Sequence, residues 1–490
     1  MTPPPPTAAP AVLRTPPSAP VPPADRRTLR REARRVLLRN WTGAATVPSH
    51  GLYPHQWSWD SAFIAIGLRH LSPLRAQREL ETLLGAQWGD GRIPHIVFNP
   101  AVPLDAYFPS PDFWRSSTAG ADAGAPRGLE TSGIVQPPVH ALAALLVHRT
   151  DPALSHGRGF LARVYPRLVA WHRYLTAQRD LGGGGLAAIV HPWEPGMDNS
   201  PCWDRPLSRV EPAPPTAFRR ADLDHGAAAD RPTDLDYGRY VRLATDYRDR
   251  GYRDRGYGDG GTTPGKTTPA TPHPAFAVED PGVNALLIAS EHALAEIATA
   301  LGADPAPHRH RARALTAALL ERLWDPAAGQ FLCRDLVAGK LLPDRSAAGL
   351  LPLLVPGLPR TVVRALLGTA RGTHFGLGTT VPLLPSYDLR GPAFDRYRYW
   401  RGPAWFNVNW LMERALRRCG ETTAADALRT AALDAAAASN FAEYVDPYTA
   451  EGRGTRDFSW TAALALDLLA GPGRDRDNHH DTVLDGEGQR

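Results

Sequence analysis

Apolar residues recur every three to four positions along most of the chain, which is the period of an amphipathic helix. In the clearest case, Val283, Leu287 and Leu294 share one face of a predicted helix. Asp25 precedes another such segment and is a candidate N-cap. The same criteria predict about twelve helices, over residues 25–39, 61–71, 74–88, 136–148, 159–178, 233–247, 281–301, 308–323, 360–367, 403–417, 422–439 and 458–469.

No segment alternates apolar and polar residues as a half-buried strand does, so we expect an all-α fold. Short connections alternate with long ones, and the long ones carry most of the Trp, Tyr, Asp, Glu and Arg residues. Loops on a rigid scaffold often carry function, so this asymmetry favours an (α/α)6 barrel with long loops on one face. We expect one barrel domain over residues 26–470, mobile insertions near 206–230 and 248–274, and disordered tails at 1–25 and 471–490.

The charge pattern argues against several classes of partner. The formal net charge is +5, and nearly all the positive charge is arginine, spread along the chain. No basic run is interleaved with aromatic residues, so a nucleic-acid partner is not expected. No apolar run is long enough to span a membrane, and the Pro-rich residues 2–23 lack the apolar region of a signal peptide.

The cysteine and histidine spacing does not suggest a metal site. Cys202, Cys333 and Cys419 have neither disulfide-framework nor zinc-ligand spacing, which fits a reducing cytoplasm. Three isolated histidines are interpreted as structural: His55, His95 and His191. We therefore expect no metal ion and no organic cofactor.

The stretch over residues 193–204, WEPGMDNSPCWD, is a candidate catalytic loop. Its prolines break any helix, and Gly196 lets the backbone approach a ligand closely. Asp198 lies near two tryptophans and Met197, in surroundings that can keep a carboxyl protonated near neutral pH. Such a group can donate a proton to a leaving oxygen. The alternative is an ordinary Asx-turn with core tryptophans.

A second carboxyl of similar character, Glu443, lies between Phe441 and Tyr444, shortly before Pro447. Paired carboxyls on opposite sides of a sugar can cleave a glycosidic bond, one protonating the leaving oxygen and the other activating water. Asp198 and Glu443 are so far apart in sequence that only a closed fold could bring them together. Taken alone, Glu443 would be a structural cap or salt-bridge residue.

Two further loops combine aromatic rings with charged groups, as sugar-binding clefts do. In residues 53–60, Trp59 and Asp60 are expected to be exposed while Trp57 is buried; alternatively, Asp60 caps a helix that starts at Ser61. Residues 397–405 hold several aromatic rings beside Pro403, which is predicted to occupy the first position of a helix.

Eight stretches together resemble the glycoside hydrolase family 63 group, especially its bacterial mannosylglycerate and glucosylglycerate hydrolases. They follow the family order over nearly all of residues 26–470: GLYPHQWSWDSAF (51–63), GRIPHIVFN (91–99), GIVQPPVHA (133–141), WEPGMDNSPCWD (193–204), RPTDLDYGRY (231–240), YWRGPAWFNVNW (399–410), FAEYVDPYTAEGRG (441–454) and FSWTAAL (458–464). The resemblance implies an (α/α)6 barrel and an inverting mechanism.

The resemblance also implies roles for individual residues. The general acid falls on Asp198 and the general base on Glu443. Arg231 and Tyr237 would hold the carboxylate of glycerate. The residues expected around the sugar are Tyr53, Trp59, Asp60, Gln136, Trp193, Tyr399, Trp400 and Trp405. This chain departs from the family at Val445, at Phe458 and in the two insertions, and we expect these departures to affect the acceptor rather than the chemistry.

The spacing around Arg231 is compatible with that role. Pro232 begins a predicted helix, and just under two turns separate Arg231 from Tyr237, so both side chains can reach one spot. A guanidinium binds a carboxylate through its planar pair of N–H groups. The alternative is a surface ion pair between Arg231 and Asp234 or Asp236, which would contribute little.

These observations predict an inverting α-glycoside hydrolase that releases hexose and glycerate from α-glucosylglycerate or α-mannosylglycerate. A trehalase- or oligosaccharide-type α-glucosidase is the alternative within enzymes, and an inactive sugar-binding protein is the alternative outside them. Glycine loops for nucleotides, serine-nucleophile elbows and the Asp-rich motif of terpene cyclases are absent from the sequence. A small-molecule glycoside is the expected partner, and a homo-oligomer is left open.

Overall fold

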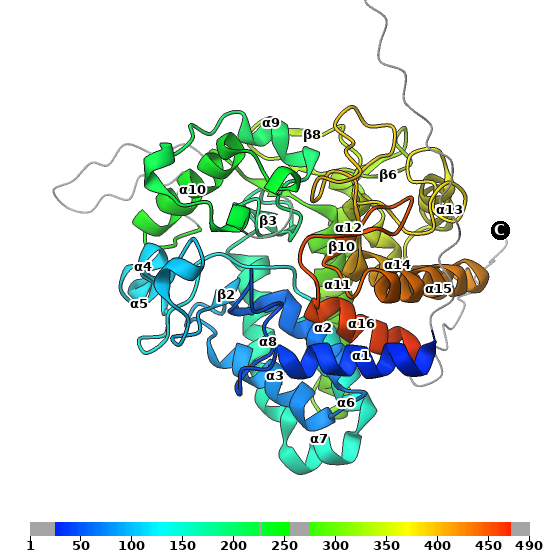
Figure 1. The fold of residues 1–490 in the computed structure, drawn as a ribbon, viewed down its shortest axis with the longest axis horizontal. Coiled ribbons are helices and arrows are strands. Elements are labelled where there is room, and N and C mark those ends of the chain that lie inside the picture. The colour runs from blue at the N-terminus through cyan, green and yellow to red at the C-terminus, as the bar shows by residue number, and fades with distance from the viewer. Residues whose placement is uncertain (1–24, 225–227, 255–273, 472–490) are drawn as a thin grey trace, which may run out of the picture.

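The computed structural model describes residues 25–224, 228–254 and 274–471, and within them the protein is mostly helical (Figure 1). The α-helices are α1 (Arg26–Arg39), α2 (Ser58–Leu68), α3 (Pro73–Gly85), α4 (Pro111–Trp114), α5 (Ser116–Ala119), α6 (His140–Thr150), α7 (Pro152–Arg158), α8 (Phe160–Ala177), α9 (Asp204–Leu207), α10 (Asp234–Asp249), α11 (Pro281–Ala300), α12 (Ala306–Leu323), α13 (Arg360–Arg371), α14 (Phe406–Arg418), α15 (Thr422–Ala438) and α16 (Ser459–Ala470).

All the helices expected from the periodicity are present, and side-chain caps begin several of them. Asp25 accepts backbone N–H bonds at the start of α1, and Thr233 forms a capping box with Asp236 at the start of α10. Three predicted starts were wrong by three or more residues, and one of them is that of α6, which begins at His140 rather than at Gln136. Helix α2 begins at Ser58, so Asp60 lies inside its first turn and does not cap it. Helix α14 begins at Phe406, so Pro403 precedes it.

The structure also contains short strands, which were not predicted from the sequence. Two-residue strands pair the loops: β1 (Gln56–Trp57), β2 (Ile96–Val97), β3 (Ala188–Ile189), β4 (Val278–Glu279), β5 (Trp324–Asp325), β6 (Gln330–Phe331), β7 (Arg334–Asp335), β8 (Lys340–Leu341), β9 (Ala404–Trp405), β10 (Tyr444–Val445) and β11 (Gly452–Arg453). The sheets have the orders β1-β2, β3-β4-β7-β8, β5-β6 and β11-β10-β9, and all the pairings are antiparallel. Two residues are too few to show an alternating pattern in the sequence.

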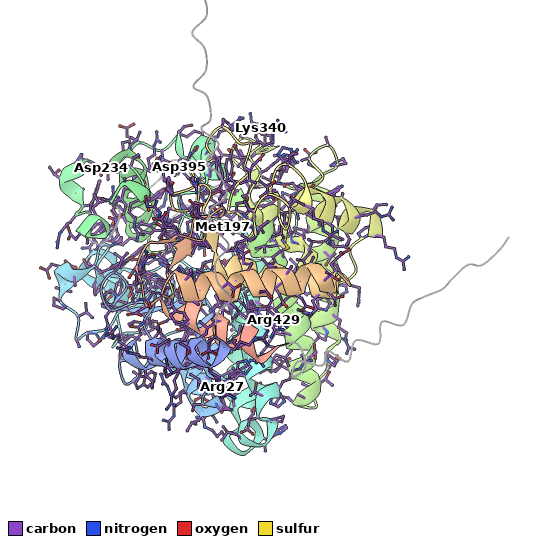
Figure 2. All side chains as sticks on the ribbon, turned by 45° about the vertical axis from the view of Figure 1, so that its right-hand side comes forward. Arg27, Met197, Asp234, Lys340, Asp395 and Arg429 are labelled. Atoms are coloured by element: carbon purple, nitrogen blue, oxygen red, sulfur yellow. The ribbon has the colours of Figure 1, made fainter. Side chains whose placement is uncertain are left out.

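The two ends of the described chain meet in the core. Helix α16 packs against α1 and α2, so the last helix lies beside the first ones (Figure 1). Every residue of α2 is buried, and most of α11 is buried too, as expected for helices that are apolar on all sides. Met197 lies near the middle of the view in Figure 2, whereas the exposed Lys340 lies at its upper edge. Within the described ranges, no helix has the length and apolarity to cross a bilayer.

Parts of the two expected insertions pack against the body of the protein. In residues 206–224, Leu207 and Val210 are buried in a cluster with Tyr237 and Tyr240. Short helices follow: η4 (Pro215–Ala217), η5 (Ala221–Asp224) and η6 (Ala228–Asp230). In the second insertion, Asp254 accepts hydrogen bonds from the hydroxyls of Tyr174 at 2.6 Å and Tyr247 at 2.5 Å. Residues 255–273 and the two expected tails, apart from Asp25 and Gly471, lie outside the described residues.

Candidate active site

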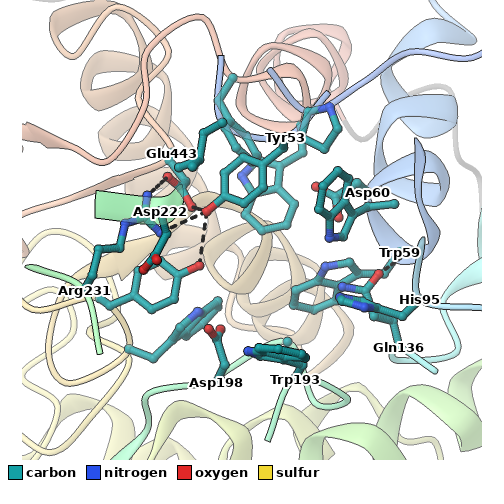
Figure 3. A pocket seen from close by; sticks show the side chains of 18 of the residues that line it. Tyr53, Trp59, Asp60, His95, Gln136, Trp193, Asp198, Asp222, Arg231 and Glu443 are labelled. Carbon is teal, nitrogen blue, oxygen red and sulfur yellow. Dashed lines mark hydrogen bonds and ion pairs between the residues drawn. The ribbon is translucent and has the colours of Figure 1, made fainter. Parts of the chain in front are cut away.

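One cavity brings together every site residue predicted from the sequence (Figure 3). Its lining includes Tyr53, Trp59, Asp60, Gln136, Trp193, Gly196, Asp198, Arg231, Tyr237, Tyr399, Trp400, Trp405 and Glu443. These residues come mostly from the loops and helix starts, so the helical scaffold positions them and the loops supply the chemistry.

A three-stranded sheet positions Glu443. After α15 ends, Asn440 and Phe441 adopt left-handed conformations with φ of 53° and 51°, which turn the chain sharply into β10. Strand β10 pairs with β9 and β11, with Tyr444 opposite Trp405. Because Glu443 immediately precedes β10, this pairing fixes the backbone that carries its carboxyl, and Glu443 lines the same cavity as Trp405 of β9.

The carboxyl of Glu443 is buried and held by three donors. Its Oε1 accepts from the hydroxyl of Tyr53 at 2.9 Å, and its Oε2 accepts from the backbone N–H of Thr455 at 3.2 Å and from Arg231 Nη2 at 3.5 Å. Gly454 permits this close packing, since a Cβ there would lie 2.3 Å from Oε2. Burial raises the pKa of Glu443, while the charge of Arg231 opposes this.

The loop of Asp198 is anchored by a buried ion pair just upstream. Arg179 donates to both oxygens of Glu194, at 2.7 and 2.6 Å, and Glu194 also accepts from the backbone N–H of Val190 at 2.7 Å. Beyond it, the hydroxyl of Tyr240 donates to the Asp198 carbonyl at 2.7 Å. The backbone that presents the Asp198 carboxyl is therefore fixed from both sides.

Asp198 and Glu443 have the electrostatic character of an acid and an anchored base. Burial raises the pKa of Asp198 from 3.8 to about 7, and the nearby Glu443 charge adds to the rise. A carboxyl of this kind keeps its proton near neutral pH. Glu443 instead has three donors around its carboxylate, which favour the charged form. Such a pair is able to carry general acid–base chemistry.

Stacked aromatic rings form the walls of the cavity. Trp405 stacks on Trp400 with ring centroids 3.8 Å apart, and on its other neighbour Tyr444 at 4.6 Å. Gly196 has φ +70° and lies against Trp59, where a Cβ would be 2.3 Å from the indole ring. Trp59, Trp400 and Trp405 thus give the cavity apolar aromatic walls of the kind against which sugar rings pack.

The expectation that Trp59 and Asp60 would be exposed was wrong. Each retains only 3% of its exposed area, although both line the cavity. Trp59 is oriented by Gln136, whose side-chain oxygen accepts from the Trp59 backbone N–H at 3.0 Å. Burial raises the pKa of Asp60 well above its ordinary value.

Arg231 is buried at the cavity rather than paired on the surface. It donates to the Tyr53 hydroxyl at 2.9 Å as well as to Glu443, and its guanidinium lies 4.8 Å from the ring centre of Tyr399. The alternative of a surface pair was wrong: Asp234 accepts from Arg220, and Asp236 accepts within the α10 capping box. Tyr237 also lines the cavity, and its hydroxyl donates to the Phe108 carbonyl at 3.0 Å.

Several residues of the lining were missed in the sequence. Tyr107, Asp222 and Phe458 all line the cavity, and so does His95, which was interpreted as structural. Among the described residues, none hydrogen-bonds the buried Nδ1 of His95, and burial lowers its pKa to about 3. Asp222 was hidden in a segment rich in Pro, Arg and Ala that was expected to be a mobile insertion, and no local signal distinguished it.

His191 and His55 behave as interpreted. His191 Nε2 lies 2.9 Å from the Tyr240 carbonyl, and its Nδ1 accepts from the Trp193 backbone N–H at 3.1 Å. His55 Nδ1 accepts from the backbone N–H of Asn99 at 3.2 Å. Across the part of the chain that the structure describes, no three His, Cys, Asp or Glu side chains converge as metal ligands would.

A mostly helical scaffold that brings two buried carboxyls and several aromatic rings into one cavity is compatible with a glycoside hydrolase. Comparison with known proteins agrees with that class. The chain belongs to the mannosylglycerate hydrolase MGH1-like glycoside hydrolase family, whose model matches residues 53–461.

Similar proteins cover nearly the whole described chain. The mannosylglycerate hydrolase of Rubrobacter radiotolerans is 42% identical over 442 residues, which are 89% of this chain and 96% of that protein. The glucosylglycerate hydrolase of Mycolicibacterium hassiacum is 37% identical over 456 residues, again 89% of this chain and 96% of the relative. A crystal structure of the GH63 mannosylglycerate hydrolase from Thermus thermophilus in complex with Tris and D-glycerate is similar with a TM-score of 0.78 at 40% identity, over 90% of this chain and 99% of that one.

Proposed function

We propose that the protein is an inverting α-glycoside hydrolase that cleaves α-glucosylglycerate or α-mannosylglycerate to hexose and glycerate. The observation that carries the proposal is the single cavity in which Asp198, Glu443 and Arg231 face stacked aromatic rings. The names of the relatives, which are hydrolases of mannosylglycerate and glucosylglycerate, support the same class of substrate.

In the proposed mechanism, Asp198 protonates the glycosidic oxygen while Glu443 removes a proton from a water on the opposite face of the sugar. The raised pKa of Asp198 supports its role as the acid. Tyr53 and Arg231 hold the Glu443 carboxylate by hydrogen bonds and so orient the base. Inversion requires room for the water, so we expect the two carboxyl groups to be roughly 6.5–9.5 Å apart.

Arg231 supplies the selectivity for an anionic aglycone. A guanidinium has five N–H donors, and Arg231 uses one for Tyr53 and one for Glu443, which leaves donors for a glycerate carboxylate. Tyr237 lines the same cavity, and its phenol would reach the carboxylate by giving up its present hydrogen bond to the Phe108 carbonyl. The sugar would be held by lining residues of the cavity, namely Trp59, Asp60, Gln136, Trp193, Gly196, Tyr399, Trp400 and Trp405, with no metal ion or organic cofactor taking part.

We also propose that the helices form an (α/α)6 barrel in a cytoplasmic enzyme. The packing of α16 against α1 and α2 supports closure, because it joins the two ends of the helical series. The free thiols of Cys202, Cys333 and Cys419 support a reducing compartment. Light scattering of the purified protein distinguishes a monomer from a homo-oligomer.

The deciding experiment measures hexose released by the purified protein from glucosylglycerate, mannosylglycerate, trehalose and kojibiose. We expect turnover of at least one glycerate glycoside, and proton NMR of the first-formed product should show the β-anomer. Release from trehalose or kojibiose but not from either glycerate glycoside would favour an α-glucosidase of the trehalase or oligosaccharide type. Binding without turnover would identify an inactive sugar-binding protein, and α-product would contradict inversion.

A further inference from the structure

Asp222 is an additional carboxylate of the cavity and has no role in the chemistry described above. It lies on η5 in the 206–230 segment, which departs from the family pattern, and it lines the same cavity as Asp198, Arg231 and Tyr237. Figure 3 shows it on the same side of the cavity as Arg231. The segment expected to be a peripheral insertion thus contributes a hydrogen-bond acceptor to the site.

The carboxylate of Asp222 is held rigidly by Arg220. Arg220 Nε donates to Oδ1 at 2.9 Å and Nη2 donates to Oδ2 at 2.8 Å, and the guanidinium lies 4.5 Å from the ring centre of Tyr237. Each carboxylate oxygen can accept two hydrogen bonds, so this fork uses one acceptor site on each oxygen. The remaining acceptor sites are available to a hydroxyl group.

The neighbours of Asp222 place it on the side of the leaving aglycone. Burial raises the pKa values of Tyr107, Tyr237 and Asp198, and the charge of Asp222 contributes to each rise, as expected for a carboxylate near all three groups. Asp198 is the proposed donor to the leaving oxygen. A carboxylate near Asp198 and Tyr237 is therefore positioned to contact the aglycone rather than the far side of the sugar.

The two charged residues facing the aglycone match two different groups of glycerate. Arg231 can bind a carboxylate, which Asp222 would repel. Once its 2-oxygen is in the glycosidic bond, glycerate has one free hydroxyl, on carbon 3, and Asp222 can accept a hydrogen bond from it. We propose that Asp222 accepts a hydrogen bond from this hydroxyl and selects hydroxylated over unsubstituted aglycones. The inference rests on the proposed function and specifies the aglycone further.

The test uses a pair of substrates that differ by one hydroxyl. Hexosyl lactate has a methyl group where hexosyl glycerate has the carbon-3 hydroxymethyl group, and it keeps the carboxylate. A hydrogen bond to a charged group is worth about 1.5–3 kcal/mol, so wild-type kcat/KM should favour the glycerate glycoside by roughly ten- to a hundredfold. Asp222→Ala should reduce this ratio to within about threefold, because the lost hydrogen bond affects only the glycerate glycoside, whereas the smaller effect of the lost charge on the pKa of Asp198 falls on both substrates and cancels in the ratio.

Two further variants make the result specific. Asp224→Ala removes an exposed carboxylate from the same short helix, where it pairs with Arg219, and should behave like wild type. Asp222→Asn keeps an acceptor oxygen and most of the packing, so it should retain more of the preference than Asp222→Ala. It also provides a second measurement if Asp222→Ala fails to fold.

Three outcomes have distinct meanings. Equal losses on both glycosides in Asp222→Ala and Asp222→Asn would mean that the Arg220–Asp222 pair only holds the segment in place, and the inference would be wrong. A wild-type enzyme that hydrolyses both glycosides equally well would also overturn the inference but leave the proposed function intact. Failure of the wild-type enzyme to hydrolyse either glycoside would count against the proposed function itself.

Discussion

Replacing Asp198 with Asn should stabilise the folded protein at neutral and alkaline pH while removing its catalytic acid. The reason is that a carboxyl kept protonated by burial opposes folding once the unfolded chain can ionise it. Asn has nearly the same shape but no titratable group. The substitution therefore isolates the free-energy cost of the raised pKa.

The sign and size follow from the shift from 3.8 to about 7. Below about pH 4 the carboxyl is protonated in both the folded and the unfolded chain, so the pKa shift has no effect on stability. Between about pH 4 and 7 the unfolded chain ionises first, and the wild-type protein loses stability as pH rises. A pKa shift of about three units, at about 1.4 kcal/mol each, lowers the free energy of unfolding by roughly 4 kcal/mol above pH 7. This is an upper bound, because the Asp198 side chain is only partly buried.

Urea unfolding at pH 5 and pH 8 measures the effect. The stability difference between Asp198→Asn and wild type should grow by as much as about 3 kcal/mol between these pH values. Asp224→Asn is the matched control, since Asp224 is exposed and pairs with Arg219 on the surface. If the free energies of unfolding of Asp198→Asn and wild type changed with pH in parallel, the reasoning would be refuted.

Three further predictions concern turnover. Asp198→Asn and Glu443→Gln should each lower kcat at least about a thousandfold in a released-hexose assay, and near-wild-type turnover in either would contradict the pairing. Wild-type kcat/KM should fall as pH rises through about 7, because Asp198 then loses its proton, and it should also fall at low pH, because Glu443 then gains one. A kcat/KM that stays unchanged up to pH 9 would argue against Asp198 as the acid. Arg231→Ala should weaken glycerate-glycoside binding by about 2–4 kcal/mol, measured as a higher KM, and an equal rise in KM for a neutral disaccharide would oppose its role as selector. Because Arg231 lowers the pKa of Glu443, the variant should also shift the acidic limb of the pH–rate profile to higher pH for every substrate.

The helices could be predicted from local sequence, whereas most of the site residues were implied by the resemblance of several loops to a known family. Helix periodicity repeats within each segment, so it is visible without knowledge of the fold, as for α11. Loop motifs such as that of Asp198 pointed to residues that line the cavity. Helix starts were less predictable: α2 begins at Ser58 without a side-chain cap, and its first turn follows the β1–β2 pairing, which is a contact between distant loops.

Only the tertiary structure decided how these residues act on one another. The pairing of β9, β10 and β11 brings Glu443 beside Trp405, and burial among distant segments sets the pKa of Asp198. The partners of Arg231 and the position of Asp222 depend on the same long-range packing. A carboxylate in an Arg-rich loop looks solvated in sequence, and whether it faces water or a cavity depends on what packs against it. The sequence by itself therefore determined the helices and the chemical groups, while the fold determined their distances, charges and accessibility.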